Sequence, residues 1–409
     1  MGSGSTPLGW AAWNGHEEVV EILLGRGDVD PNKPDNEDQT PLSCAAQNGH
    51  EGVVEILLRR DDTNPNKPDY SGRTPLWYAA LGAHEGVVKM LLERDDVNPD
   101  EPNRFYGLTP LWCASRNGRE EVVKMLLGRD DVSPNKQDER GRTPLDRAAK
   151  NGHEGVVKVL LGRSDVNPNG FPQFYLSPLC RAAQYGHERV VKLLLGRGDV
   201  DPNKLGWCGR TPLGCAAQYG HERVVKILLE QCHINPDRPD SNGQTPLWGA
   251  AARGHQGVVS ILLGRDDVNP DKPDNDGQTP LSCAAENGRE GVVEILLAQG
   301  DVDPDKPDSF GRTPLNCAAA NGHEGVVKIL LGRDEVNPNQ PNRCGCTPLC
   351  CAAVGGHERI VKMLLERNDV NPNQPDNSGR TPLGWATEYN QVRVIALLQP
   401  PESTTPSAT

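Results

Sequence analysis

The sequence predicts an all-helical solenoid, a fold that grows by stacking repeated units rather than around one core. Three observations predict it. One segment recurs every 34 residues, with one extra residue before Thr109; each copy holds two short patterns at helical spacing; and each complete copy closes with a proline-containing stretch. The twelve copies, of which the last is truncated, start at Thr6, Thr40, Thr74, Thr109, Thr143, Ser177, Thr211, Thr245, Thr279, Thr313, Thr347 and Thr381.

The copy that starts at Thr40 shows how the first helix is defined. Thr40 is a helix N-cap, because its hydroxyl accepts a hydrogen bond from an amide that has no partner within the helix. Pro41 suits the first turn, where no amide hydrogen is needed. The sequence PLSCAAQN follows, and Gly49 ends the helix in the left-handed conformation that glycine adopts without strain. We therefore expect a helix over residues 41–48.

A second helix and a finger complete the copy. His50 and Glu51 open the second pattern, whose apolar positions form one broad face. Pro65 and Pro68 cannot continue a helix, and residues 69–72 are typical of a turn. Each copy is therefore a helix, a turn, a second helix and an extended finger. The apolar face consists of Val53, Val54, Ile56, Leu57 and Leu58.

A single copy is too small to be stable alone. Burying its apolar side chains is worth roughly 10 to 15 kcal/mol, whereas ordering the backbone costs about 1 kcal/mol or more for each residue. Neighbouring copies must therefore share the burial. Helical layers spaced roughly 8 to 10 Å apart would give an elongated, curved body on the order of 100 Å long.

Such a unit resembles the ankyrin repeat. The family signature TPLHxAAxxGHxxVVxxLL is met by TPL, AA, GHE, VV and LL in almost every copy, over residues 6–398. The resemblance implies an all-α ankyrin-repeat solenoid, a curved stack whose fingers stand at right angles to the helices. We expect residues 1–5 to be a leader and residues 399–409 to be a disordered polar tail.

The chain departs from the family pattern in two systematic ways. The finger is two residues longer than usual and carries one or two prolines, so we expect it to be stiffer and less hairpin-like. The family histidine after TPL is absent from every copy. Its place is taken by Gly9, Ser43, Trp77, Trp112, Asp146, Cys180, Gly214, Trp248, Ser282, Asn316, Cys350 and Gly384.

Composition excludes several classes of partner. A net charge of -13 and a pI near 5.3 argue against nucleic acid or an anionic membrane, since both need a basic face. The longest apolar stretches have six residues, which is too short to cross a membrane, and we expect no signal peptide. We expect a cytoplasmic protein, with the nucleus as a second location.

The cysteine positions favour packing over disulfides. Six cysteines occupy one slot, two residues after TPL, where a small apolar residue fits between neighbouring copies. A reducing compartment also disfavours disulfides. These cysteines are Cys44, Cys113, Cys215, Cys283, Cys317 and Cys351.

The histidines are expected to be architectural. Nine of the ten occupy the histidine position of the GH motif, and Arg119 and Arg289 fill the same position in two other copies. A position that tolerates arginine is neither a general base nor a metal ligand. His233, in a loop beside Cys232, is interpreted as a loop variant. The nine are His16, His50, His84, His153, His187, His221, His255, His323 and His357.

One cysteine cluster offers a different function. Four thiols at a fingertip and the next helix could hold zinc in a sulfur cage or act as redox-sensing groups. We favour neither, because Cys351 has the packing role and the adjacent Cys350 must point elsewhere on the helix. The cluster consists of Cys344, Cys346, Cys350 and Cys351.

The useful functional signal is variation between copies. The sequence has no phosphate-binding loop, no nucleophile elbow and no Ser, His and Asp set that stands out from the repeat, so we expect no catalysis and no cofactor. The framework scarcely changes, whereas fingertips and the ends of first helices do. Three fingers are unusual: NRFYGL at 103–108, NGFPQFYL at 169–176 and NKLGWCGR at 203–210.

These fingers carry aromatic residues where other copies carry small polar ones. With the tyrosines just before two GH glycines, they would form a stripe on the concave face, and exposed rings are typical of interface hot spots. The alternative is that the rings fold onto neighbouring fingers as local core. Trp77, Trp112 and Trp248 are expected to pack between layers. The stripe consists of Phe105, Tyr106, Phe174, Tyr175, Tyr185, Trp207 and Tyr219.

The resemblance and these residues together predict a protein-binding scaffold that is not an enzyme. Its protein partner would contact the concave finger and first-helix surface near repeats four to seven. A second hypothesis makes the chain the ligand-sensing segment of a larger receptor-like or signalling protein. We expect a monomer or a part of a larger chain.

Overall fold

The computed structural model describes residues 4–171, 177–206, 209–231 and 233–399. It divides into two compact units, residues 1–207 and residues 208–409, which are described separately. The regular structure of the described residues consists of 24 short helices without strands. The predicted all-α class is confirmed.

In the first unit, six repeats each contribute a first and a second helix. The first helices are α1 (Pro7–Asn14), α3 (Pro41–Asn48), α5 (Pro75–Gly82), α7 (Pro110–Arg116), α9 (Pro144–Asn151) and α11 (Pro178–Gln184). The second helices are α2 (Glu17–Leu24), α4 (Glu51–Leu58), α6 (Glu85–Leu92), α8 (Glu120–Leu127), α10 (Glu154–Leu161) and α12 (Glu188–Leu195).

The second unit repeats the same scheme. Its first helices are α13 (Pro212–Gln218), α15 (Pro246–Arg253), α17 (Pro280–Glu286), α19 (Pro314–Asn321), α21 (Pro348–Gly355) and α23 (Pro382–Glu388). Its second helices are α14 (Glu222–Leu229), α16 (Gln256–Leu263), α18 (Glu290–Leu297), α20 (Glu324–Leu331), α22 (Glu358–Leu365) and α24 (Val392–Leu398).

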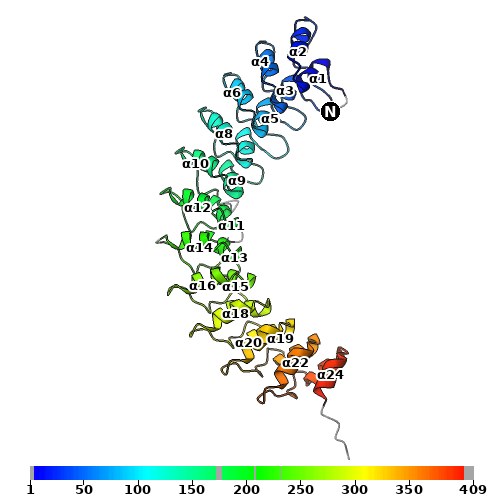
Figure 1. The fold of residues 1–409 in the computed structure, drawn as a ribbon, viewed down its shortest axis with the longest axis vertical. Coiled ribbons are helices and arrows are strands. Elements are labelled where there is room, and N and C mark those ends of the chain that lie inside the picture. The colour runs from blue at the N-terminus through cyan, green and yellow to red at the C-terminus, as the bar shows by residue number, and fades with distance from the viewer. Residues whose placement is uncertain (1–3, 172–176, 207–208, 232, 400–409) are drawn as a thin grey trace, which may run out of the picture. The chain divides into compact units, whose positions relative to one another are not determined.

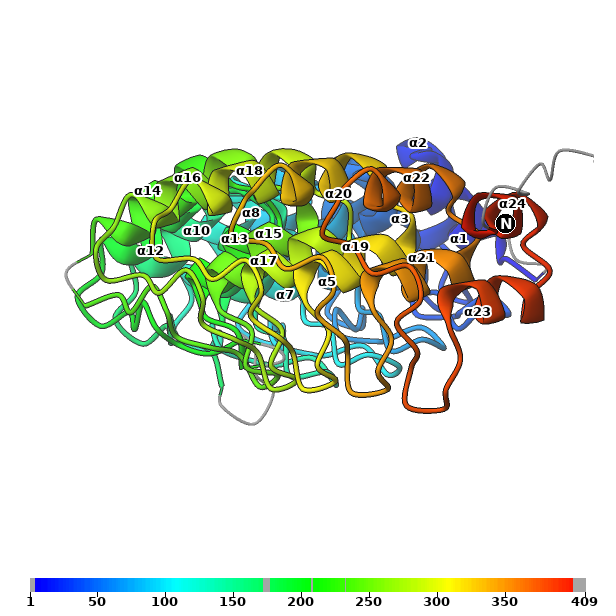
Figure 2. The ribbon, with the colours of Figure 1, turned by 90° about the horizontal axis from the view of Figure 1, so that it is seen from below.

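Within each unit the helices form two rows. First helices pack on the first helices of the neighbouring repeats, as α3 does on α1 and α5, and second helices pack on second helices. Figure 1 shows the even-numbered row beside the odd-numbered row in each unit. Figure 2 shows that the fingers extend from the side of the odd-numbered helices. Each unit therefore has a face built from first helices and fingers, which we call the first-helix face.

The predicted helix ends are confirmed. The amide of Ser43 donates to the hydroxyl of Thr40 over 3.1 Å, and Pro41 is the first helical residue. At the other end Gly49 has φ +74°, the left-handed conformation that glycine permits. In the next copy Ala83 takes that conformation, with φ +64°.

The core lies between the two rows of helices. The copy that starts at Thr40 fully buries Ala45 and Ala46 of the first helix and Val53, Val54 and Leu57 of the second. Equivalent residues are buried in the interior copies of both units. Because each helix has only seven or eight residues, this shared burial is the main reason that the helices are stable.

The histidines of the GH motif connect neighbouring repeats, which confirms their architectural role. The imidazole Nε2 of His323 donates to the carbonyl oxygen of Glu286 over 2.8 Å. A Cβ on Gly288 would lie 2.6 Å from the same ring, so glycine leaves room for it. In the last repeat Gln391 replaces the histidine and donates through its Nε2 to the carbonyl of Val354 over 3.2 Å.

Arginines at the ends of second helices make a further connection. Arg94 donates from Nη1 to the carbonyl of Leu58 over 3.0 Å, and its Nε and Nη2 each lie 2.8 Å from an oxygen of Asp96. The hydrogen bond to Arg94 lowers the pKa of the Asp96 carboxyl. The same set recurs at Arg60, Arg129, Arg163, Arg197, Arg265 and Arg367.

Asparagines in the fingers form a third connection. The Oδ1 of Asn66 accepts the amide hydrogen of Asn98 over 2.8 Å, while its Nδ2 donates to the carbonyl of Asp96 over 2.5 Å. One side chain thus satisfies a donor and an acceptor of the next repeat. Asn135 and Asn339 do the same in their copies.

Aspartate replaces this asparagine in four copies and leaves the connection incomplete. Asp271 still accepts the amide hydrogen of Asp303 at Oδ2 over 2.9 Å. Its Oδ1 takes the place of the asparagine amide nitrogen. A carboxylate oxygen cannot donate a hydrogen bond, so the bond that the asparagine donates is missing. That oxygen is buried and has no hydrogen-bond partner, and the same holds for Asp100, Asp237 and Asp305. Burial raises the pKa of Asp237, Asp271 and Asp305.

Replacing the three aspartates of the second unit is predicted to stabilise the protein at neutral pH. In Asp237→Asn, Asp271→Asn and Asp305→Asn combined, each new amide group should donate to a carbonyl of the next repeat, as the asparagines of other copies do. The folded-state pKa values lie above the unfolded value of about 3.9, so between these two values the folded protein binds more protons than the unfolded chain. The contribution of the aspartates to the stability of the folded protein is therefore lost as the pH rises through the folded pKa. The stability gain should therefore be small near pH 4 and grow with pH, as measured by urea unfolding.

The reverse substitution is the matched control. Asn339→Asp should destabilise the protein at neutral pH, and the loss should shrink as the solution is acidified. A gain from the triple variant that is independent of pH would contradict the assignment.

The histidine connection predicts a difference between two substitutions at one position. His323→Ala removes the bond to Glu286 and should lower the free energy of unfolding by about 1 kcal/mol. His323→Gln should retain most of the stability, because Gln391 makes the equivalent bond in the same unit. Urea unfolding followed by circular dichroism measures both, and equal losses for the two variants would show that the hydrogen bond is not the stabilising feature.

Candidate functional site

The fingertips are fixed by local hydrogen bonds. Asp69 accepts the amide hydrogen of Arg73 at Oδ1 over 2.8 Å and receives its guanidinium at Oδ2. Neighbouring fingers are joined by one backbone bond, in which the amide of Arg104 donates to the carbonyl of Ser71 over 2.8 Å. A Cβ on Gly72, which has φ +78°, would meet the backbone of Arg104, so glycine allows this close approach. Side chains at the tips are therefore presented from an ordered edge.

Two adjacent fingertips of the first unit carry exposed aromatic rings. We call Tyr70, Arg104, Phe105 and Tyr106 the fingertip cluster. Tyr70 is 60% exposed, Phe105 46% and Tyr106 56%. The centroids of Tyr70 and Phe105 lie 6.0 Å apart with the rings tilted by 50°, and the guanidinium of Arg104 lies 5.9 Å from the Tyr70 ring. The Tyr70 and Phe105 rings contact each other and all three rings remain exposed to solvent, which combines features of both sequence hypotheses.

Tyr70 was missed by the sequence reasoning. Its finger has the small residues Ser71 and Gly72 at the tip, so it does not stand out beside the three unusual fingers. The signal was present in the residue one position earlier, where other fingers carry a polar residue. A search for aromatic residues at the two positions before each finger glycine finds Tyr70.

The two predicted tyrosines at the ends of first helices are exposed. Tyr185 follows α11 and is 43% exposed; its ring stacks on His187 at 6.4 Å, and the ammonium of Lys150 lies 5.3 Å from the ring centroid. Tyr219 follows α13 in the second unit and is 50% exposed. Phe174, Tyr175 and Trp207 lie outside the described residues.

The tryptophans after TPL pack between layers, as predicted. Trp77 and Trp112 are buried, and Trp248 is half-buried. Each indole donates to a carbonyl of the following finger: Trp77 to Leu108 over 3.0 Å, Trp112 to residue 142 over 3.1 Å and Trp248 to residue 278 over 3.1 Å. These rings therefore attach the base of a finger to the first helix of the same repeat.

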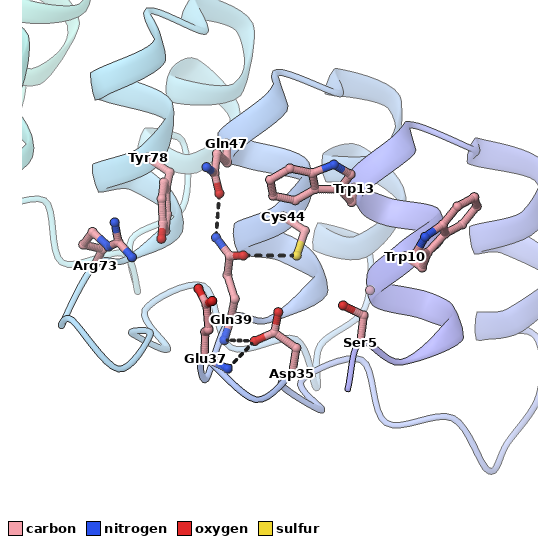
Figure 3. A pocket seen from close by; sticks show the side chains of 11 residues that line it. Ser5, Trp10, Trp13, Asp35, Glu37, Gln39, Cys44, Gln47, Arg73 and Tyr78 are labelled. Carbon is pink, nitrogen blue, oxygen red and sulfur yellow. Dashed lines mark hydrogen bonds between the residues drawn. The ribbon is translucent and has the colours of Figure 1, made fainter. Parts of the chain in front are cut away.

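A recess of about 220 Å³ lies on the first-helix face of the first three repeats (Figure 3). The polar groups on its wall bond with one another: the Gln39 amide donates to Gln47 over 2.6 Å, and the Cys44 thiol lies 3.8 Å from the Gln39 oxygen. Burial, aided by Asp35, raises the pKa of Cys44 to about 12. Cys44 is therefore a protonated packing residue and not a nucleophile.

The cysteine cluster near the end of the chain is only partly exposed. Cys344 is exposed, Cys346 and Cys351 are half-buried, and Cys350 is fully buried. The expectation that Cys351 takes the core position and Cys350 points elsewhere is wrong. The first slot after TPL also faces the neighbouring layer, as buried Trp112 shows in its own copy.

The thiols of this cluster do not favour metal binding. Burial raises the pKa of Cys346 to about 11 and that of Cys351 to about 12, so forming the thiolates that a zinc site needs would cost free energy at both positions. Across the described ranges, no group of three or more His, Cys, Asp or Glu residues is arranged to hold a metal ion. All cysteines that the structure describes there are free thiols.

Comparisons with known proteins agree with the repeated architecture. A family model described as ankyrin repeats (3 copies) matches residues 8–103, 96–170, 179–274, 266–342 and 334–406. A search of curated proteins finds no match to the chain. No helix among the described residues has the length and apolar character needed to cross a membrane.

Thiol reactivity is predicted to differ sharply within the tryptic peptide 344–359. At pH about 8 iodoacetamide should modify exposed Cys344 first, because Cys346 has a raised pKa and Cys350 is buried. Modification of Cys346 should accelerate as pH rises towards 11. Mass spectrometry localises the modified sites, and Cys344→Ser should remove the early product. Fast modification of Cys346 at neutral pH would instead indicate a reactive thiol pair.

Proposed function

Since the chain belongs to the ankyrin repeat family, whose members are generally protein-binding modules, we propose that it is a scaffold that binds a protein partner on its first-helix face. Family members are typically non-enzymatic, and the proposal assigns this chain no catalytic step. The partner contacts would be concentrated where the repeats differ from one another. In the first unit these positions are the fingertip cluster and Tyr185; in the second unit Tyr219 is the corresponding position.

The observation that carries the proposal is the exposure of the fingertip rings. Fingertips are surface positions that the fold does not require to be aromatic, since other tips carry serine, asparagine or glycine. An exposed ring supplies a large contact area at a low cost in side-chain entropy, which is why tyrosine is enriched at binding hot spots. The hydrogen-bonded fingers hold the rings in place before binding, which lowers the entropy lost on association.

Removing two rings of the cluster is predicted to weaken partner capture. Phe105→Ala with Tyr106→Ala should lower the amount of the principal captured protein by about tenfold or more, the size expected for hot-spot residues. Quantitative mass spectrometry after capture on the immobilised chain measures the change. Helix content should be unchanged, because both rings are about half exposed and lie outside the core.

Phe310→Ala is the matched control. Phe310 sits at a fingertip of the second unit, is 57% exposed and has a guanidinium, that of Arg312, 5.3 Å from its ring. Capture that is insensitive to the first pair, or equally sensitive to Phe310→Ala, would overturn the assignment of the fingertip cluster. The pair Phe174→Ala and Trp207→Ala applies the same measurement to the predicted positions outside the described residues.

A further inference from the structure

The first-helix face of the first unit carries a concentration of basic side chains in a chain whose net charge is -13. They come from three consecutive first helices, α7, α9 and α11, and from the turn before α9. Besides Glu139 and Arg140, which are exposed at the tip of the turn, these elements carry five cations and two carboxylates, Asp138 and Asp146. We call this group the basic patch; its cations are Arg116, Arg142, Arg147, Lys150 and Arg181.

Three of these cations surround one buried ring. The guanidinium carbons of Arg116 and Arg142 each lie 5.7 Å from the centroid of the Trp112 ring, and that of Arg147 lies 5.9 Å away. The ring is itself held by its bond to the following finger. Cation and ring contacts of this kind fix the direction of an arginine without neutralising its charge.

The two carboxylates neutralise only part of this charge. Asp138 accepts Arg142 at 2.5 Å. Asp146 accepts Arg147 at 2.6 Å and lies 3.6 Å from Nε of Arg181, so that one carboxylate serves two arginines. Both aspartates are buried, so the carboxylates of a partner cannot take their place beside these arginines unless the helices unpack.

Three of the five cations are accessible to a partner. Arg116 is exposed, and Lys150 and Arg181 are half-buried. The ammonium of Lys150 lies over the exposed ring of Tyr185, so charge and aromatic surface occur together. The first helices of the second unit differ, since α17 and α23 end in Glu286 and Glu388 and only α15 ends in an arginine, Arg253.

We propose that the basic patch binds an acidic peptide segment of the partner, one that carries aspartate or glutamate side chains beside an aromatic residue. The proposal rests on the proposed function and names the chemistry of the partner. Carboxylates match the accessible arginines, which form paired hydrogen bonds with them, and an aromatic residue would contact Tyr185. Three accessible cations suit a few carboxylates, whereas nucleic acid binding depends on many phosphate contacts and a predominantly basic protein.

A peptide titration of the full chain tests the proposal. The probe is a short fluorescent peptide of alternating glutamate and tyrosine, and the reference peptide has glutamine in place of glutamate. Fluorescence anisotropy at low salt should show binding of the acidic peptide alone, weakening as salt is added. Arg116→Glu with Lys150→Glu should weaken binding by about tenfold or more. Absence of binding, or equal binding of both peptides, would overturn the proposal.

The control variant reverses a charge on the other unit. Arg253 is exposed at the end of α15, and Arg253→Glu should leave peptide binding unchanged. Both variants alter only side chains with accessible ends, and circular dichroism verifies that helix content is preserved. If Arg253→Glu weakens binding as much as the patch variant does, the attraction is not located at the basic patch and the proposal fails.

The test distinguishes this proposal from the proposed function. Capture of a partner that depends on Phe105 and Tyr106, together with no binding of the acidic peptide, would reject the acidic class and leave the binding scaffold intact. A single-stranded oligonucleotide of equal charge is titrated in parallel, and tighter binding of the oligonucleotide than of the peptide would also reject the acidic peptide. If the wild-type chain neither captures a partner nor binds the acidic peptide, both the binding scaffold and the acidic-peptide proposal are rejected.

Discussion

Shared burial between neighbouring repeats is the constraint on which the structure depends. Helices of seven or eight residues are too short to persist alone in water, and the valines, leucines and alanines of each copy are covered by its own second layer and by the neighbouring copies. The repeated sequence follows from this, because every layer must present the same apolar surface to both neighbours. The polar connections obey the same rule: the histidine, arginine and asparagine bonds each join one repeat to the next rather than closing within a repeat.

This dependence makes departures from the repeat meaningful. Where asparagine becomes aspartate, as at Asp271, the framework keeps its geometry but loses a hydrogen bond, and an unpaired buried oxygen remains. Such positions, one in the first unit and three in the second, are predicted to cost stability at neutral pH. Where glycine follows the first helix, the neighbouring imidazole fills the space that a side chain would occupy. These positions are fixed by the stack and are unavailable for binding.

The positions left open to vary are the fingertips and the first-helix face. The first unit uses this freedom for exposed rings at Tyr70, Phe105 and Tyr106 and for the cations around Trp112. These features lie on elements that are already ordered by the finger bonds and by buried tryptophans, so a partner would meet a preformed surface. The two proposals therefore have a common physical basis, in which the rings supply contact area and the cations select the charge of the partner.

The sequence alone determined the helices, their caps, the core positions and the architectural role of the histidines, because period, proline, glycine and apolar spacing act over a few residues. It did not determine how side chains of different repeats meet. Only the tertiary structure decided that Cys350 is buried, that Tyr70 joins Phe105, that Asp271 leaves an oxygen unpaired and that three arginines converge on Trp112. Most of these facts depend on contacts between residues about one repeat apart, whose distances are fixed by the stacking of layers and not by the local pattern.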